Sequence, residues 1–352
     1  MRIGAVAGAL PKHHYDQDAL ITGFVRYWGK QHHNPDRLVR LHQAVQVGGR
    51  HLALPMEDYP NLTFGEANNA FIRVGTDLGA EAIEQALQQV GLDPQDIDVI
   101  FTTTVTGVAT PSLDARLVNR LGLRSDVKRI PIFGLGCVAG AAGISRMHDY
   151  LKGHPNDVAV LLSVELCSLT LQRGDFSVAN LIASGLFGDG AAAVIGMGEQ
   201  RAHDEGCTGP KVVKTQSRFY PNTERVMGWD IGDNGFKIVL AASVPDVVRE
   251  HIQADVDGFL SAMDLTRDDI HTWVCHPGGP KVLTAFEDCL ELPENALEHT
   301  WASLHNVGNL SSASVLLVLR DTLVQTSPPP KSLGMLMAMG PGFCSELVLL
   351  EW

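Results

Sequence analysis

The sequence has no long uninterrupted apolar run near its start, which argues against two classes of protein. The opening stretch MRIGAVAGALPKHH holds one arginine, and Pro11 and Lys12 end its short apolar part. A membrane-spanning helix needs about 20 consecutive apolar residues, and a secretory signal needs a longer apolar core followed by a cleavage site. We therefore expect no membrane span and a cytoplasmic protein.

Cysteine is scarce and scattered. The 6 cysteines lie at positions 137, 167, 207, 275, 289 and 344, far from one another in the sequence. A chain of 352 residues, 45% of them hydrophobic, can bury a core that holds its fold without disulfides. We therefore expect reduced thiols.

Positive charge is also in deficit. There are 27 Lys and Arg residues against 40 Asp and Glu residues, which gives a formal net charge of -13. A nucleic-acid-binding protein usually carries an excess of basic residues over a broad surface. This balance argues against a nucleic-acid partner, and we expect a small ligand, with local arginines available to meet its negative groups.

What is present is a faint internal duplication. Residues 80–103 read as a helix, a turn and a buried strand, and residues 249–276 repeat that order. Further on, GCVAGAA aligns with GNLSSAS, so that Cys137 and Asn309 occupy equivalent positions 172 residues apart. A repeat of this length, with helices alternating with apolar strands, predicts two fused α/β halves.

The border between the halves is predicted near residue 205. The segment GEQRAHDEGCTGP, residues 198–210, is polar, rich in turn formers and flanked by apolar strands. We therefore predict an N-terminal half over residues 1–205 and a C-terminal half over residues 206–352.

Cys137 stands in the segment FGLGCVAG, among residues with almost no side chain. Small residues and then apolar residues at helical spacing follow it, which places the thiol at or just before a helix N-terminus. The helix dipole and the free amides there favour a thiolate, and the glycines let a substrate approach the backbone. The sequence thus predicts a nucleophilic thiol, with a buried structural cysteine as the alternative.

A nucleophilic thiol needs a basic partner, usually a histidine that the fold brings close. Of the 14 histidines, His276 ends the predicted strand HTWVCH and is followed by the tight loop PGGP. The paired histidines at 13–14 and 32–33 lie in polar surroundings without a cysteine or carboxylate cluster, so no metal site is predicted. His276 is the preferred partner.

Asn309 is predicted to share the cavity of Cys137. If the two halves pack around a pseudo-twofold axis, the helices that begin at these equivalent positions point toward one cavity. Asn309 is then a candidate hydrogen-bond donor there, although an asparagine at a helix start is also an ordinary N-cap.

Six ordered segments together resemble the type III polyketide synthases, the chalcone synthase-like branch of the thiolase-type condensing enzymes. They are TGVATPSLDARL (106–117), GLGCVAGAAG (134–143), GLFGDGAAAVIG (185–196), HPGGPKVL (276–283), GNLSSASVLLVL (308–319) and GPGFCSE (340–346). The resemblance covers most of the chain and is weakest in the first sixty residues. It implies a thiolase-like fold in which two duplicated α/β halves form a layered αβαβα arrangement.

The resemblance also implies roles for individual residues. Cys137 would be the nucleophile, and His276 and Asn309 would complete a Cys-His-Asn triad. The implied substrate-pocket residues are Phe187, Phe236, Thr170, Cys167, Ser311 and Thr110. The implied CoA-binding residues are Arg37, Arg40, Gly278 and Lys281. Without the family, the two phenylalanines would be interpreted as ordinary core residues.

The implied activity is that of an acyltransferase. An acyl-CoA starter loads onto Cys137, malonyl-CoA extends it by decarboxylative condensation, and the product cyclises. The segment MGWDIGDNGFKIVL (227–240) resembles bacterial alkylpyrone and alkylresorcinol synthases, so we expect a medium or long fatty acyl starter and an alkylpyrone or alkylresorcinol ring. No cofactor is expected, because the CoA thioesters are substrates, and the family implies a homodimer.

Two alternatives stay open on the sequence, a ketoacyl synthase and a non-catalytic protein, and a third is disfavoured. A ketoacyl synthase of the type that starts fatty-acid synthesis shares the triad but performs one condensation. A hydroxymethylglutaryl-type synthase would need a glutamate near the thiol, and none is predicted there. A non-catalytic acyl-CoA-binding protein would keep the fold without releasing CO₂.

Overall fold

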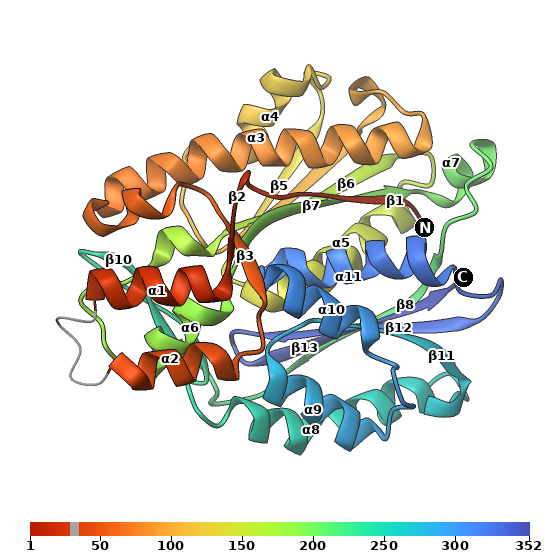
Figure 1. The fold of residues 1–352 in the computed structure, drawn as a ribbon. Coiled ribbons are helices and arrows are strands. Elements are labelled where there is room, and N and C mark those ends of the chain that lie inside the picture. The colour runs from red at the N-terminus through yellow and green to blue at the C-terminus, as the bar shows by residue number, and fades with distance from the viewer. Residues whose placement is uncertain (29–34) are drawn as a thin grey trace.

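The described part of the chain is built on a 9-stranded sheet whose order is β11-β12-β13-β8-β1-β7-β6-β4-β5 (Figure 1). The computed structural model describes residues 1–28 and 35–352, so His32 and His33 lie outside the described residues. The strands of the first half are β1 (Arg2–Ala9), β4 (Val99–Thr104), β5 (Lys128–Phe133), β6 (Val158–Leu166) and β7 (Asp189–Met197). Those of the second half are β8 (Lys211–Phe219), β11 (Ile270–Cys275), β12 (Leu333–Gly340) and β13 (Cys344–Glu351).

The two halves repeat one strand pattern. In the first half, β4 runs parallel to β6, and β6 runs antiparallel to β7. In the second half, β11 runs parallel to β12, and β12 runs antiparallel to β13. The helices and strands predicted over 80–103 and 249–276 are present as parts of α3 (Phe64–Val90), β4, α8 (Val244–Ser261) and β11. The predicted duplication is confirmed.

The helices form three layers around the strands. Helices α3 and α4 (Leu113–Leu121) pack on strands of the first half, and α8 with α9 (Pro280–Leu290) lies on the far side of the second half (Figure 1). Between them, α5 (Ala139–Gly153) and α11 (Ser314–Asp321) contact strands of both halves. The layered thiolase-like αβαβα arrangement expected from the sequence is confirmed.

The central strands are apolar because helices cover both of their faces. Every residue of β6 and β7 is buried. The long helix α3 begins with a capping box between Thr63 and Glu66 and ends at Gly91, whose φ of 68° is readily adopted by glycine. These local signals fix where the covering helix begins and ends.

Helix α5 approaches the second half closely at Gly140. A Cβ at this position would lie 2.3 Å from the Ser312 carbonyl oxygen, which is far inside van der Waals contact. Glycine is therefore required for the starts of α5 and α11 to meet in the middle layer. This approach brings the segment around Cys137 against the segment around Asn309.

The remaining helices and strands are α1 (Gln17–Trp28), α2 (Pro35–Ala44), β2 (His13–Asp16), β3 (Gly49–Leu52), α6 (Val178–Leu186), α7 (Glu199–Asp204), β9 (Met227–Gly232), β10 (Gly235–Leu240) and α10 (Glu298–Val307). Of these, α1, α2, α6 and β10 lie at one end of the molecule, and α7 lies at the opposite end (Figure 1). The predicted connector between β7 and β8 contains the short helix α7, and the division at residue 205 stays a prediction. Within the described ranges, every helix is too short or too polar to cross a membrane.

Candidate active site

Cys137 lies in a single 3₁₀ turn, Gly136–Val138, that leads directly into α5. Gly136 has a φ of 55°, and a Cβ there would lie 2.7 Å from the Pro341 ring. Glycine is therefore needed both for the left-handed turn and for the contact with Pro341. The buried thiol donates to the Ser311 hydroxyl, with Sγ 3.6 Å from Oγ.

Asn309 is held by its backbone and oriented by its side chain. Its N–H donates to the Leu186 carbonyl at 2.9 Å, and its carbonyl accepts from Gly188 N–H at 2.9 Å. Its side-chain oxygen accepts from the Ser311 N–H at 2.8 Å, and its Nδ2 lies 3.4 Å from the Gly278 carbonyl oxygen. Because that last hydrogen bond is long, the amide nitrogen is available to another acceptor.

His276 directly follows β11, which ends at Cys275, one residue before the predicted end of the strand. Its N–H donates to the Met337 carbonyl at 3.0 Å, and its carbonyl accepts from Gly278 N–H at 2.8 Å. The imidazole ring is buried, and within the described structure neither ring nitrogen has a hydrogen-bond partner. Hydrogen bonds from Cys137 to Ser311, from Ser311 to Asn309, from Asn309 to Gly278 and from Gly278 to the backbone carbonyl of His276 thus connect the three predicted triad residues in one chain.

Burial sets the charge of the thiol and the imidazole. It raises the pKa of Cys137 to about 12, against a smaller lowering by the Ser311 hydroxyl. It lowers the pKa of His276 to about 3. Burial therefore favours the neutral thiol and the neutral imidazole, since a single ion would be poorly solvated there. Transfer of the thiol proton to the imidazole would form two opposite charges that stabilise each other.

Glu165 lies near the thiol, contrary to the sequence-based expectation of no such glutamate. It is fully buried in β6, and its negative charge contributes to the raised pKa of Cys137. Its carboxylate accepts hydrogen bonds from the Ser312 hydroxyl at 2.5 Å, the Thr106 hydroxyl at 2.9 Å and the Val105 N–H at 3.1 Å. These donors occupy the carboxylate oxygens. The sequence feature that could have predicted a buried glutamate here is the single ionisable residue, Glu165, in the mostly apolar strand VAVLLSVEL.

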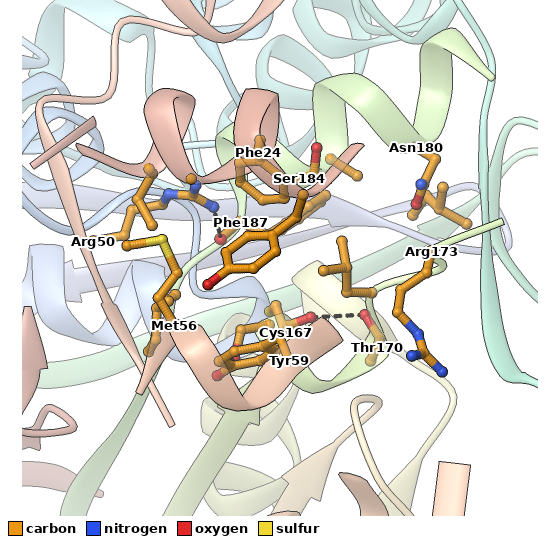
Figure 2. A pocket seen from close by; sticks show the side chains of 18 of the residues that line it. Phe24, Arg50, Met56, Tyr59, Cys167, Thr170, Arg173, Asn180, Ser184 and Phe187 are labelled. Atoms are coloured by element: carbon orange, nitrogen blue, oxygen red, sulfur yellow. Dashed lines mark hydrogen bonds between the residues drawn. The ribbon is translucent and has the colours of Figure 1, made fainter. Parts of the chain in front are cut away.

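Two adjoining cavities flank this region. The first, the thiol cavity, holds about 380 Å³ of empty space, part of it open to solvent, next to Cys137 and Ser311. The second, the α1 cavity, encloses about 830 Å³, part of it open to solvent, between α1, the 3₁₀ helix Met56–Asn61 and α6 (Figure 2). Four side chains line both cavities: Cys167, Phe187, Trp229 and Ile238. These four side chains form a wall that the thiol cavity shares with the larger, apolar α1 cavity.

The structure brings several predicted pocket residues to these cavities. Cys167 and Phe187 line both, Ser311 lines the thiol cavity, and Thr170 lines the α1 cavity, where its hydroxyl donates to the Cys167 carbonyl at 2.8 Å (Figure 2). Ser311 has a left-handed backbone with a φ of 48°, which is uncommon for a residue with a side chain.

Phe236 is not on either cavity, which corrects its predicted placement. It packs edge to face on Phe64, with ring centroids 5.7 Å apart, and lies 6.0 Å from the Trp229 ring. Because these two rings cover it, Phe236 lines a separate recess beside α3. Trp229 takes the wall position at the thiol cavity, and sequence reasoning missed it although it stands in the segment MGWDIGDNGFKIVL.

The predicted CoA-binding residues are spread over the surface near the site. Arg37 and Arg40 lie on the exposed side of α2, and Lys281 is exposed in the first turn of α9. Gly278 is closer to the triad through its contact with Asn309. Thr110 is exposed in the loop before α4 and lines neither cavity of its own chain.

Comparison with known proteins assigns the chain and its fold to one family. Residues 67–212 match the family described as FAE1/Type III polyketide synthase-like protein, and residues 211–351 match the chalcone and stilbene synthases, C-terminal domain. The chain belongs to the type III polyketide synthases. This type III polyketide synthase is therefore a condensing acyltransferase that uses malonyl-CoA.

Several relatives of this synthase are similar over almost their whole length. A 1,3,6,8-tetrahydroxynaphthalene synthase of Streptomyces peucetius subsp. caesius is 54% identical over 99% of this chain and 93% of its own. A putative chalcone synthase of Bacillus subtilis is 34% identical over 99% of this chain and 98% of its own. The crystal structure of the 1,3,6,8-tetrahydroxynaphthalene synthase of Streptomyces coelicolor A3(2) superposes with a TM-score of 0.94 at 30% identity, covering 100% of this chain and 99% of that one.

Proposed function

We propose that this synthase makes 1,3,6,8-tetrahydroxynaphthalene, using malonyl-CoA both to start and to extend the chain. The observation that carries the proposal is the 54% identity, over 99% of the chain, to a synthase of that name. The second candidate is the fatty acyl starter, with an alkylpyrone or alkylresorcinol product. The apolar lining of the α1 cavity by Leu20, Phe24 and Met56 favours it.

In the proposed mechanism, Cys137 is the nucleophile and His276 accepts its proton. The thiolate attacks the carbonyl carbon of the CoA thioester, the carbon–sulfur bond to CoA breaks, and the acyl group stays on Cys137. The CoA sulfur takes a proton as it leaves. The unpartnered ring nitrogens of His276 support this role, because a buried polar group without a partner is usually completed by a ligand or by the reaction itself.

Malonyl-CoA then enters and loses CO₂. The electron pair of the broken carbon–carbon bond forms an enolate, whose negative charge develops on the thioester oxygen. In this mechanism His276 and Asn309 donate hydrogen bonds to that oxygen, and loss of one such donor typically costs about 3 to 4 kcal/mol of barrier. The fixed orientation of the Asn309 amide, set by the Ser311 N–H, supports the proposal. The enolate carbon attacks the acyl carbonyl on Cys137, the carbon–sulfur bond to Cys137 breaks, and the extended chain is then a CoA thioester. The thiolate of Cys137 attacks this thioester in turn, so the chain returns to the thiol and CoA is released.

The product test uses the purified protein with malonyl-CoA as its sole substrate. We expect 1,3,6,8-tetrahydroxynaphthalene, identified by mass spectrometry against an authentic standard, together with released CO₂. A parallel panel of acyl-CoA starters of graded chain length tests the second candidate. Turnover only with fatty starters would overturn the proposed product, a single extension would indicate a ketoacyl synthase, and binding without CO₂ release would indicate a non-catalytic protein.

We also propose a homodimer that forms along the edge strand β5. Phe133 at its end is 52% exposed, and Val108 in the neighbouring loop is 44% exposed. Large apolar side chains gathered at a sheet edge favour a protein interface. Thr110 lies in the same exposed loop.

We expect Phe133→Asp to weaken this dimer, because the carboxylate would be desolvated in the interface. Sedimentation velocity should show a shift from the dimer toward the monomer. The matched control is Phe219→Asp, which replaces an exposed phenylalanine of β8. An unchanged dimer in the Phe133 variant, or equal dissociation in the control, would contradict the proposed interface.

The CoA phosphates are proposed to contact Arg37, Arg40 and Lys281, with Gly278 beside the pantetheine arm. The exposure of the two arginines on α2 and of the lysine on α9 supports this assignment, because guanidinium and ammonium groups at the surface bind phosphate without a large desolvation cost.

A further inference from the structure

Arg50 is a buried cation on the wall of the α1 cavity that the mechanism above does not use. It stands in the short strand β3, and its side chain is only 3% exposed (Figure 2). Its Nη1 donates to the Phe187 carbonyl at 2.7 Å. Among the described residues, neither its Nε nor its Nη2 has a hydrogen-bond partner.

The nearby negative charge does not satisfy those two nitrogens. Asp189 attracts Arg50 electrostatically, but its carboxylate accepts from the Ala53 N–H at 2.7 Å and from the Ser168 N–H at 2.8 Å. The Ser168 hydroxyl also donates to it. Within the described ranges, no carboxylate lies at ion-pair distance from Arg50. A buried guanidinium with two free N–H groups is costly unless a ligand completes it.

The two free nitrogens define the chemistry of that ligand. Nε and Nη2 lie on the same edge of the planar guanidinium, and together they donate two parallel hydrogen bonds. This edge matches the two oxygens of a carboxylate. The α1 cavity is largely apolar, and its other lining arginine, Arg173, donates to the backbone carbonyls of Pro60 and Leu62. A carboxylate at the end of a flexible chain therefore fits the free edge of Arg50 better than a methyl group does.

We propose that Arg50 binds the terminal carboxylate of a malonyl-primed polyketide chain through Nε and Nη2. This inference rests on the proposed function, in which malonyl-CoA supplies the primer. Each extension inserts two carbons next to the thioester on Cys137, so the carboxylate of the primer moves away from the thiol. The α1 cavity adjoins the thiol cavity through Cys167, Phe187, Trp229 and Ile238, and it receives that distal end.

The binding selects the primer by charge. A fatty acyl chain in the α1 cavity would leave the guanidinium unpaired, whereas a carboxylate chain completes it. The isovaleryl group is a neutral match for the malonyl group, because it has the same branching with two methyl groups in place of the carboxylate oxygens. Arg50 therefore favours malonyl-primed chains over isovaleryl-primed chains.

The test measures full-length products by mass spectrometry, with malonyl-CoA alone and with isovaleryl-CoA added. In Arg50→Met, we expect full-length malonyl-primed product to fall about tenfold to a hundredfold relative to short products, as expected for a lost charge-assisted bidentate pair. Isovaleryl-primed product should fall much less. Arg50→Lys should give an intermediate result, because it keeps the charge but not the two parallel donors.

The control variant is Arg2→Met, which removes another arginine that donates to a backbone carbonyl, that of Gly209 at 2.7 Å. It should leave the product ratio unchanged. If Arg50→Met is folded by circular dichroism and keeps the wild-type ratio, the inference is wrong and the proposed function stands. If the wild-type protein makes nothing from malonyl-CoA alone, both fail.

Wild-type protein provides a second arm if the Arg50 variants do not fold. Chains trapped on Cys137 during turnover with malonyl-CoA should retain the primer carboxylate in their intact mass. The wild type should also choose malonyl over isovaleryl primers by about tenfold or more. Trapped chains without the carboxylate, or equal use of the two primers, would overturn the assignment.

Discussion

Replacing Cys137 with alanine is expected to abolish both covalent acylation of the protein and product formation. The mechanism stores each intermediate as a thioester on this sulfur, so its loss removes the attacking group and the attachment point together. The measurement is incubation with radiolabelled malonyl-CoA, followed by intact-mass spectrometry and product analysis. Wild-type protein should carry label on a peptide that contains residue 137, and the variant should carry none.

Two other thiols serve as comparisons for this experiment. Cys289 lies in α9 away from both cavities, so Cys289→Ala should keep the label and the product. Cys167 lines the same cavity as Cys137, but burial and the charges of Glu165 and Asp189 raise the pKa of its thiol well above the usual value. Cys167→Ala should therefore still be labelled. Persistent label in Cys137→Ala would identify a different nucleophile.

The sequence predicted those parts of the site that lie in the duplicated segments of the two halves. Cys137 lies within the 3₁₀ turn that leads into α5, and Asn309 lies two residues before the matching 3₁₀ turn, Ser311–Ala313, that leads into α11. The repeat therefore placed both residues near the start of a middle-layer helix, but the residue that matches Cys137 in the second turn is Ser312. His276 could be chosen among the histidines because it ends a strand and precedes a tight loop. These features depend on residues close in sequence, and a repeat or a periodic pattern reveals them.

The parts that were missed depend on packing between distant segments. Arg50 stands in a short strand and, judged by its neighbours in sequence, belongs to a solvated surface. Its burial arises because Phe187, 137 residues further on, lies against it. Phe236 and Trp229 lie on adjacent strands of one hairpin, and only the position of Phe64 at the start of α3 decides which of them faces the thiol cavity.

The change from His276 to alanine is expected to have two separable effects. Product formation should fall about a hundredfold to a thousandfold, as for the loss of a preorganised donor at a developing oxyanion. Alkylation of Cys137 by iodoacetamide should also move to higher pH. Burial raises the pKa of the thiol, and an imidazolium beside it would oppose that shift by stabilising the thiolate. Without the imidazole, only the raising effect of burial remains.

His148 provides a matched control for this shift. It is also buried, neither of its ring nitrogens has a partner within the described structure, and burial lowers its pKa to about 4. The charges that act on it are those of Lys152, the N-terminal amine and, in the opposite direction, Asp149, toward the far end of α5 from the thiol. His148→Ala should therefore cost stability and leave the alkylation profile of Cys137 in place. An unchanged alkylation profile in His276→Ala would contradict a role of the histidine in stabilising the thiolate, and would leave it only the role of hydrogen-bond donor to the enolate.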